Sequence, residues 1–279
     1  MQIAVVGECT RDLYLDRGVS MVGGISLHFA VQARRSLGPA GEVALVSCTG
    51  ADAAGDAVRE ALCRAGVDLS RLHTRPGPTA TQRIDLRADG ERHFPEGGYD
   101  PGVLSDFRLG PDDRAFIATC DVVVAPYFRQ VEHLFHSAMH AARPGARRVA
   151  DFLDGADLGA TYVGIDALLG VVDLAFISGD DATVSCLLPR SCSADTLIVV
   201  THGAAGSSAL VDGHRICVPA VPVPVGERVD TTGCGDAFQA AFTVEYVTHG
   251  DVVAALRAGS EAAAEVIRHL GAIAAEFNP

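Results

Sequence analysis

The chain has 279 residues, of which 48% are hydrophobic, a composition that supports a sizeable buried core and argues against disorder. Its formal net charge of −13 disfavours nucleic acid as a partner, because an acidic surface repels phosphate backbones. All 22 basic residues are arginine, which excludes a Walker A loop and any cofactor held as a lysine imine.

Buried strands and amphipathic helices alternate along the chain. Residues 2–6 form an apolar run that ends at Gly7 and predicts a strand, and residues 25–37 carry apolar side chains at helical spacing. Val43–Val46 predicts a second strand, and residues 52–65 a second helix. The same criteria predict later strands at Val122–Val124, Arg148–Phe152, Val172–Ile177 and Leu197–Val200, and helices near 130–142, 181–187, 235–247 and 251–269.

Two hairpins interrupt this alternation. Asp89-Gly90 and Asp212-Gly213 each separate two short runs of strand character and are typical hairpin turns. The alternation elsewhere predicts a mostly parallel sheet covered by helices on both faces. Segments at approximately 11–22 and 76–100 do not follow it. We expect residues 1–279 to form a single domain from which these two segments project as a small β-sheet lid.

The eight cysteines form neither a C-x-x-C pair nor a tight cluster with histidine, so no zinc site is indicated. The first seven residues are too short for a signal peptide and lack its basic flank, and no apolar run reaches transmembrane length. We therefore expect a reduced cytoplasmic protein without a membrane partner.

The most informative segment is Asp230-Thr231-Thr232-Gly233-Cys234-Gly235-Asp236, which directly precedes a helical run. Glycines let successive backbone N–H groups point at one spot, and at a helix N-terminus such groups bind an anion without any lysine. Asp236 lies in the first turn, where it could take a proton from an acceptor hydroxyl during phosphoryl transfer. A capped helix after a glycine turn is the structural alternative, and residue types alone do not separate the two.

This segment resembles the C-terminal D-T-x-G-A-G-D signature of the ribokinase-like (PfkB) carbohydrate kinases. Four further parts of the chain resemble motifs of the same family and occur in the expected order. They are Gly23-Gly24 with Arg34-Arg35-Ser36-Leu37-Gly38, Thr49–Gly55 with Leu62–Asp68, Gly90–Phe94, and Thr201–Gly206. The resemblance spans nearly the whole chain. It implies a ribokinase-like three-layer α/β/α sandwich with a mostly parallel central sheet and a small β-sheet lid.

The resemblance also implies ATP-dependent transfer of the γ-phosphate to a hydroxyl, expected to be the primary CH2OH, of a sugar or sugar-like molecule. It makes Asp236 the general base and places the anion hole at Gly233, Cys234, Gly235 and the Asp236 N–H. The family usually has alanine where Cys234 stands, and a small cysteine keeps the N–H in place. A redox role for Cys234 is the alternative, and it requires a lowered thiol pKa.

Substrate-side residues follow from the same resemblance. Asp12 would grip sugar hydroxyls, since a carboxylate accepts two hydrogen bonds from a diol. Gly23 and Gly24 would let the backbone approach the sugar, and Arg92 on the lid could reach a charged substrate or phosphate. His28 replaces the asparagine of the family's G-G-x-x-x-N motif, and this departure leaves the substrate open.

On the nucleotide side, the family's N-x-x-E motif corresponds to Ser178-Gly179-Asp180-Asp181. Asp181 would organise Mg²⁺ through water, with Asp180 as an alternative and Asp151 as a further carboxylate near the pocket. The resemblance assigns the remaining nucleotide contacts to Ser178, Thr201, Gly203, Gly206 and Ser260. It leaves a requirement for a monovalent cation open.

The stretch from Phe94 to Phe107 is most similar to fructosamine (fructoselysine-type) kinases. A nucleoside kinase, an aminosugar or cyclitol kinase, and a catalytically inactive sugar sensor on the same fold remain alternatives. A dinucleotide-dependent oxidoreductase is excluded because no G-x-G-x-x-G follows the first strand. Lid strands in the family often pair between subunits, which makes a homodimer through the lid a further expectation.

Overall fold

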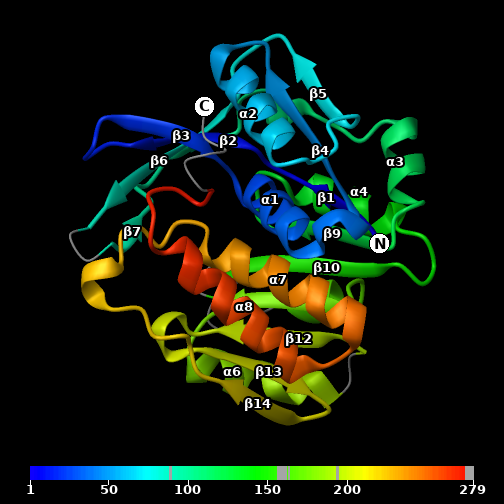
Figure 1. Cartoon of the computed structure of the whole chain (residues 1–279). Coiled ribbons are helices and arrows are strands. Elements are labelled where there is room, and N and C mark those ends of the chain that lie inside the picture. Colours follow the sequence, from blue (N-terminus) through cyan, green and yellow to red (C-terminus); the bar gives the residue numbers. More distant parts are fainter. Residues whose placement is uncertain (88–89, 156–161, 163, 193–194, 274–279) are drawn as a thin grey trace.

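A nine-stranded sheet crosses the molecule in the computed structural model, which describes residues 1–87, 90–155, 162, 164–192 and 195–273 (Figure 1). The strand order is β14-β13-β12-β11-β10-β9-β1-β4-β5. The strands from β12 to β5 in this order pair in parallel, and β13 and β14 add an antiparallel edge. Their bounds are β1 Gln2–Val6, β4 Glu42–Gly50, β5 Leu72–Arg75, β9 Val122–Pro126, β10 Arg147–Asp154, β11 Leu174–Ser178, β12 Leu197–Thr201, β13 Ser207–Val211 and β14 His214–Val218.

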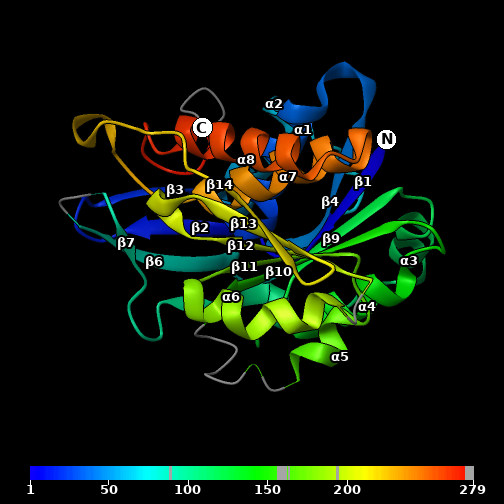
Figure 2. The same cartoon turned by 90° about the horizontal axis from the view of Figure 1, so that it is seen from below.

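Helices cover both faces of this sheet (Figure 2). One face carries α1 (Ile25–Leu37), α2 (Ala53–Arg64), α7 (Cys234–His249) and α8 (Val252–Val266), and the other carries α3 (Pro111–Ile117), α4 (Glu132–Ala141), α5 (Ile165–Leu169) and α6 (Asp181–Leu187). Successive strand residues feed the two cores in turn: Ile3 and Val5 join the first, Ala4 and Val6 the second. This period of two explains why the parallel strands are continuous apolar runs.

A second, five-stranded sheet forms the lid beside the ends of the large sheet (Figure 1). It contains β2 (Thr10–Tyr14), β3 (Val19–Gly23), β6 (Ala80–Leu86), β7 (Arg92–His93) and β8 (Tyr99–Asp100). Asp89 of the predicted hairpin turn lies outside the described residues, while β6 and β7 pair antiparallel around it. The Tyr14 hydroxyl donates to Asp230 Oδ2 at 2.7 Å and so ties the lid to the loop before α7.

The expected fold class is confirmed, and differences from the predicted elements have local causes. β4 runs on to Gly50 because Ser47 is buried in the strand and its hydroxyl donates to Gly7 O at 2.6 Å. β5 was not predicted because this edge strand, with the sequence Leu-His-Thr-Arg, contains no apolar run. In the described part of the chain, no helix is long and apolar enough to cross a membrane.

Candidate active site

A cavity of about 510 Å³ opens between the lid and the carboxyl ends of the parallel strands. Open α/β sheets bind ligands at this end of their strands. Most of the residues that line it have polar side chains, and they come from the ends of β1, β10 and β11, the starts of α1 and α7, and the lid. The lining includes Glu8, Thr10, Asp12, His28, Arg92, Tyr99, Phe128, Asp151, Asp154, Ser178, Gly235, Asp236 and Gln239.

The start of α7 presents backbone N–H groups to this cavity. Gly233 has φ +79°, and a Cβ there would lie 2.0 Å from Ala272 Cβ, so only glycine fits this turn. The Cys234 amide already donates to Thr231 O at 3.2 Å. Within the described residues, the amides of Gly235 and Asp236 have no hydrogen-bond acceptor. A Cβ at Gly235 would meet no atom within 4 Å, so the space in front of these amides is open to an anion.

Asp236 and His28 form a buried pair across the helix interface. His28 Nδ1 lies 3.1 Å from Asp236 Oδ2, and α1 and α7 pack against each other. Burial alone would lower the pKa of His28, but the hydrogen bond to Asp236 and the charges of Asp236, Asp12 and Glu8 outweigh it and raise the pKa above its ordinary value. The other ring nitrogen, Nε2, is buried without a partner among the described residues and remains available to a ligand.

Asp12 stands in the same wall, on β2. It accepts a hydrogen bond from the Thr10 hydroxyl at 2.6 Å, and burial raises its pKa although His28 partly offsets the shift. Gly23 packs against this carboxylate, since a Cβ at Gly23 would lie 2.1 Å from it. Gly24 has φ +102° and lines the cavity. The glycine pair therefore makes room for Asp12 and for the turn into α1.

Two further carboxylates in the cavity have strongly shifted acidity. Burial raises the pKa of Glu8 to about 7 and, together with the charge of Asp236, the pKa of Asp151 to about 7. Glu8, Tyr99 and Gln239 also line the cavity, although none of them was among the site residues predicted from sequence. A polar residue directly after the glycine that ends a buried strand was the available signal for Glu8, because such positions face the ligand end of the sheet.

Arg92 reaches from the lid to the loop before α7. Its guanidinium donates to Thr231 O at 2.7 Å and lies over the Phe94 ring at 5.5 Å from the centroid. The side chain is exposed at the cavity mouth, and its carbonyl partner leaves its charge unneutralised. Arg92 is therefore placed to meet an anionic group.

The expected nucleotide residues lie at the ends of the next strands. The Ser178 and Thr201 hydroxyls are 3.1 Å apart, and Ser178 lines the cavity. Gly203 and Gly206 have φ +56° and +106° in the turn after β12. Ser260 is buried on α8, and its neighbour Gly259 packs against the Phe238 ring.

Asp180 and Asp181 have partners within the protein. Asp180 caps α6 and accepts from the amides of Ala182 and Thr183. Asp181, with a side chain 83% exposed, forms an ion pair with Arg215 at 2.7 Å. The described residues contain no group of three or more His, Cys, Asp or Glu side chains that could hold a metal ion. The carboxylates that line the cavity near Ser178 are instead Asp151 and Asp154.

The pKa of the Cys234 thiol is raised, whereas a redox-active thiol needs a lowered pKa. Burial raises its pKa to about 12, so the thiol is protonated at neutral pH. Thiolates, not thiols, are the reactive species, and this argues against the redox alternative.

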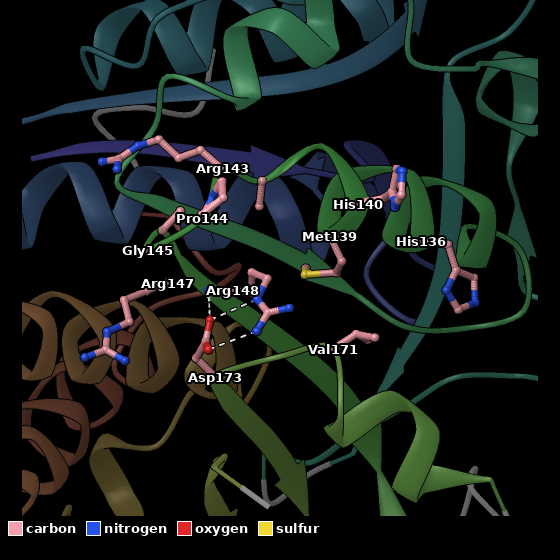
Figure 3. Close-up of a pocket in the computed structure, with 12 residues that line it drawn as sticks. His136, Met139, His140, Arg143, Pro144, Gly145, Arg147, Arg148, Val171 and Asp173 are labelled. Atoms are coloured by element: carbon pink, nitrogen blue, oxygen red, sulfur yellow. Dashed lines mark hydrogen bonds and ion pairs between the residues drawn. The ribbon is translucent and has the colours of Figure 1, made fainter.

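A larger hollow of about 780 Å³ lies elsewhere, between α4 and the start of β10 (Figure 3). Two of its three arginines are already paired: Arg148 makes two 3.1 Å contacts to Asp173, and Arg143 pairs with Asp121 at 2.8 Å. Figure 3 shows the guanidinium groups of Arg143 and Arg147 turned away from Arg148. The smaller cavity, with its convergent carboxylates and free amides, is the candidate active site.

Comparison with known proteins gives one family. Residues 2–278 match the model of the pfkB family carbohydrate kinases. The chain is 32% identical over 274 residues to fructoselysine 6-kinase of Escherichia coli, covering 97% of this chain and 98% of the relative. It is 26% identical over 289 residues to a fructosamine kinase of Bacillus subtilis, covering 98% and 93%.

Solved structures support the fold. An adenosine kinase from Sinorhizobium meliloti superposes with a TM-score of 0.81 at 20% identity, covering 98% of this chain and 96% of the other. A putative ribokinase II from E. coli, in complex with ATP and Mg²⁺, superposes with a TM-score of 0.78 at 18% identity, covering 100% and 96%. The chain belongs to the pfkB family of carbohydrate kinases and is an ATP-dependent phosphotransferase whose acceptor is a hydroxyl group of a sugar-like molecule.

Proposed function

We propose that the acceptor is a fructosamine, an amine-linked ketose, and that the phosphorylated group is its primary CH2OH. The proposal is supported by the similarity to fructoselysine 6-kinase over nearly the full length of both chains. The structural observation that supports it is the position of Asp236 in the cavity. Its carboxylate lies at the start of α7, where the backbone amides of Gly235 and Asp236 have no hydrogen-bond partner among the described residues.

In the proposed mechanism, Asp236 accepts the proton of the attacking hydroxyl as the bond to the γ-phosphorus forms. The Gly235 and Asp236 amides donate to the oxygens of the transferring phosphoryl group, where negative charge is spread in the transition state. His28 orients the Asp236 carboxylate through its 3.1 Å contact, and its free Nε2 can donate to an oxygen of the acceptor. Asp12 binds acceptor hydroxyls from the same wall, and Gly23 keeps space for its carboxylate.

We propose that the ATP phosphates lie along Ser178, Thr201, Gly203 and Gly206, with Ser260 on the side of the base. Asp151 and Asp154 fit Mg²⁺ better than Asp181 does. Asp151 is buried beside Asp236 without an ion-pair partner in the described residues, whereas Asp181 is occupied by Arg215. Bound Mg²⁺ would neutralise charge that develops on the phosphates. Its requirement, and that for a monovalent cation, is tested by titrating MgCl₂ with KCl or NaCl as the background salt.

The test is a panel of acceptors assayed by ADP release at saturating ATP. The panel contains fructoselysine, fructose, ribose, an aminosugar, a cyclitol and adenosine. We expect the highest kcat/KM with fructoselysine, and phosphorus NMR of the product to place the phosphate on the primary carbon. A nucleoside or cyclitol at the top of the ranking would replace the proposed acceptor, and no turnover with any of them would favour the sugar sensor.

We also propose a homodimer that pairs through the lid. β3 is an edge strand of the lid sheet, and Leu15 and Val19 on this hairpin expose 52% and 42% of their surface. Exposed apolar edge strands tend to pair. Light scattering of the wild type and of Val19→Arg tests this, with a dimer expected for the first and a monomer for the second. The use of ATP and the eight free thiols support a cytoplasmic location as a further proposal.

A further inference from the structure

Glu8 has an unused oxygen inside the active-site cavity. It follows β1 directly, is 5% exposed, and lines the cavity. Oε1 accepts from the Ile25 amide at 3.3 Å, whereas Oε2 is buried with no hydrogen-bond partner in the described part of the chain. Buried polar atoms are rarely left unpaired in the absence of a ligand, because burial removes their hydrogen bonds to water. The position of Oε2 therefore indicates a group that arrives with the substrate.

The chemistry around Glu8 favours a cation as that group. Five of the described carboxylates line the cavity, at Glu8, Asp12, Asp151, Asp154 and Asp236. Among the described residues, only two cationic side chains face them: His28 is engaged with Asp236, and Arg92 with a carbonyl. A buried carboxylate without a cation is unfavourable, and burial accordingly raises the pKa of Glu8 to about 7. A positively charged ligand would relieve this, whereas a neutral hydroxyl would supply a hydrogen bond and no charge.

Aromatic side chains complete the environment that a cation prefers. The Tyr99 hydroxyl faces Glu8 from the lid, and it too is buried without a well-formed hydrogen bond to any described residue. The Tyr99 and Phe128 rings meet edge to face with centroids 5.7 Å apart, and both line the cavity. Ring faces attract ammonium groups through their quadrupole. The carboxylate and the rings therefore favour the same ligand chemistry.

We propose that Glu8, assisted by Tyr99, binds the ammonium group of the amine-linked acceptor and makes this kinase selective for it over neutral ketoses. The inference rests on the proposed function, because it concerns the same cavity. It assigns a specificity-determining role to a residue that takes no part in the proton transfer at Asp236.

The experiment compares two acceptors that differ in one atom. One is a fructosyl-alkylamine, and the other is its ether, in which oxygen replaces the linking nitrogen. For the wild type we expect kcat/KM for the amine to exceed that for the ether by at least about tenfold, since hydrogen bonds to charged groups are worth about ten- to a hundredfold. In Glu8→Gln the ratio should fall towards one, and in Tyr99→Phe it should fall by a smaller factor. The matched control is Glu96→Gln, an exposed lid position that does not line the cavity.

Three outcomes would overturn the inference, and only the last of them would also overturn the proposed function. An equal loss for both acceptors in Glu8→Gln would make Glu8 a hydroxyl ligand or a structural residue, and would overturn the inference while leaving the fructosamine kinase assignment intact. A wild-type ratio near one would overturn the inference without any variant, so the test does not depend on the folding of Glu8→Gln. If the wild type phosphorylates fructose well and neither linked acceptor, the proposed function and the inference both fail.

Discussion

The acceptor side and the nucleotide side of the cavity are built in opposite ways. Asp12, His28 and Asp236 are each less than a tenth exposed, and each has a hydrogen-bond partner within the site. On the proposed nucleotide side, Asp181 is largely exposed and Gly203 has open space around its Cα. The first side is a buried network that already has its working geometry, and the second is a set of strand ends and turns that offers backbone and hydroxyl groups to solvent.

This difference predicts where single substitutions act. Preorganised groups act on the transition state with little rearrangement, so the loss of one should be large and specific to the acceptor. Contacts to a flexible, highly charged phosphate chain are many, exposed and individually weak, so the loss of one exposed carboxylate there should have a small effect. Single substitutions on the two sides test this contrast.

Asp236→Asn should lower kcat by about 10²–10⁴-fold, the usual contribution of a general base. The amide keeps the shape of the side chain but cannot take the proton. We expect the ATP dissociation constant, measured by calorimetry, to stay within about threefold of the wild type. A variant that keeps more than about a tenth of wild-type kcat on the true acceptor would remove Asp236 from the role of base.

Glu8→Gln should stabilise the ligand-free protein at high pH. The pKa of Glu8 is raised from 4.5 to about 7 in the folded protein, so the folded state holds its proton more tightly than the unfolded chain does. Stability from this proton is complete below about pH 4.5 and is lost as the pH rises through 7, an effect of about 3 kcal/mol. A glutamine side chain at this position never ionises and avoids this loss.

Urea unfolding of wild type and variant at pH 5 and pH 8 measures this effect. The variant should be more stable by up to about 3 kcal/mol at pH 8, and most of this gain should be absent at pH 5. Glu96→Gln should show no such pH-dependent gain. A gain for Glu8→Gln that is the same at both pH values would mean that its carboxylate is not desolvated as described.

Asp12→Ala should weaken acceptor binding by about ten- to a hundredfold, because a charged hydrogen-bond partner contributes about 1.5–3 kcal/mol. ATP binding should change far less, since Asp12 stands on β2 in the lid. Calorimetric titration of both ligands separates the two effects. Equal acceptor affinity in the two proteins would place Asp12 outside the acceptor site.

His28→Asn should change the ranking of acceptors while the KM for ATP stays within about threefold. Asparagine is shorter than histidine and offers different hydrogen-bonding groups, so the two cannot hold the same hydroxyl pattern equally well. The acceptor panel run on both proteins at saturating ATP measures the change. We expect ribose to be a poor acceptor for the wild type, and an unchanged ranking would make His28 a structural residue.

On the acceptor side, individual site residues could be predicted from the sequence, but the contacts between them could not. The glycines around Cys234 and the helical run after them fix the start of α7 and therefore the position of Asp236. The partner of Asp236 did not follow, because His28 lies 208 residues away and the pair forms only when α1 packs on α7. Glu8 and Tyr99 meet in the same way, between a strand end and the lid.

On the nucleotide side, a local sequence motif was a poor guide to what a residue contacts. The resemblance of Ser178–Asp181 to the family's N-x-x-E motif suggested a metal ligand. Spacing carries no information on competing partners, and here Arg215, from the antiparallel edge of the sheet, pairs with Asp181. The buried carboxylate of Asp151 at the end of β10 was noted from sequence, but its acidity depends on its burial and on the charge of Asp236, which is distant in sequence.

Asp181→Ala should therefore have the smallest effect of the series. An exposed ion pair contributes about 0–1 kcal/mol, so stability should hardly change when the contact to Arg215 is lost. If Asp151 and Asp154 hold Mg²⁺, kcat and the KM for MgATP should both stay within about threefold of the wild type. Asp151→Asn, the same loss of one carboxylate charge across the cavity, should raise the Mg²⁺ concentration needed for half-maximal activity by at least about tenfold, as loss of a charged ligand does. The reverse pattern, in which Asp181→Ala needs much more Mg²⁺ and Asp151→Asn does not, would return the metal to Asp181. It would also show that the exposed side of the cavity depends on a single residue as strongly as the buried side does, and the contrast between the two sides would no longer hold.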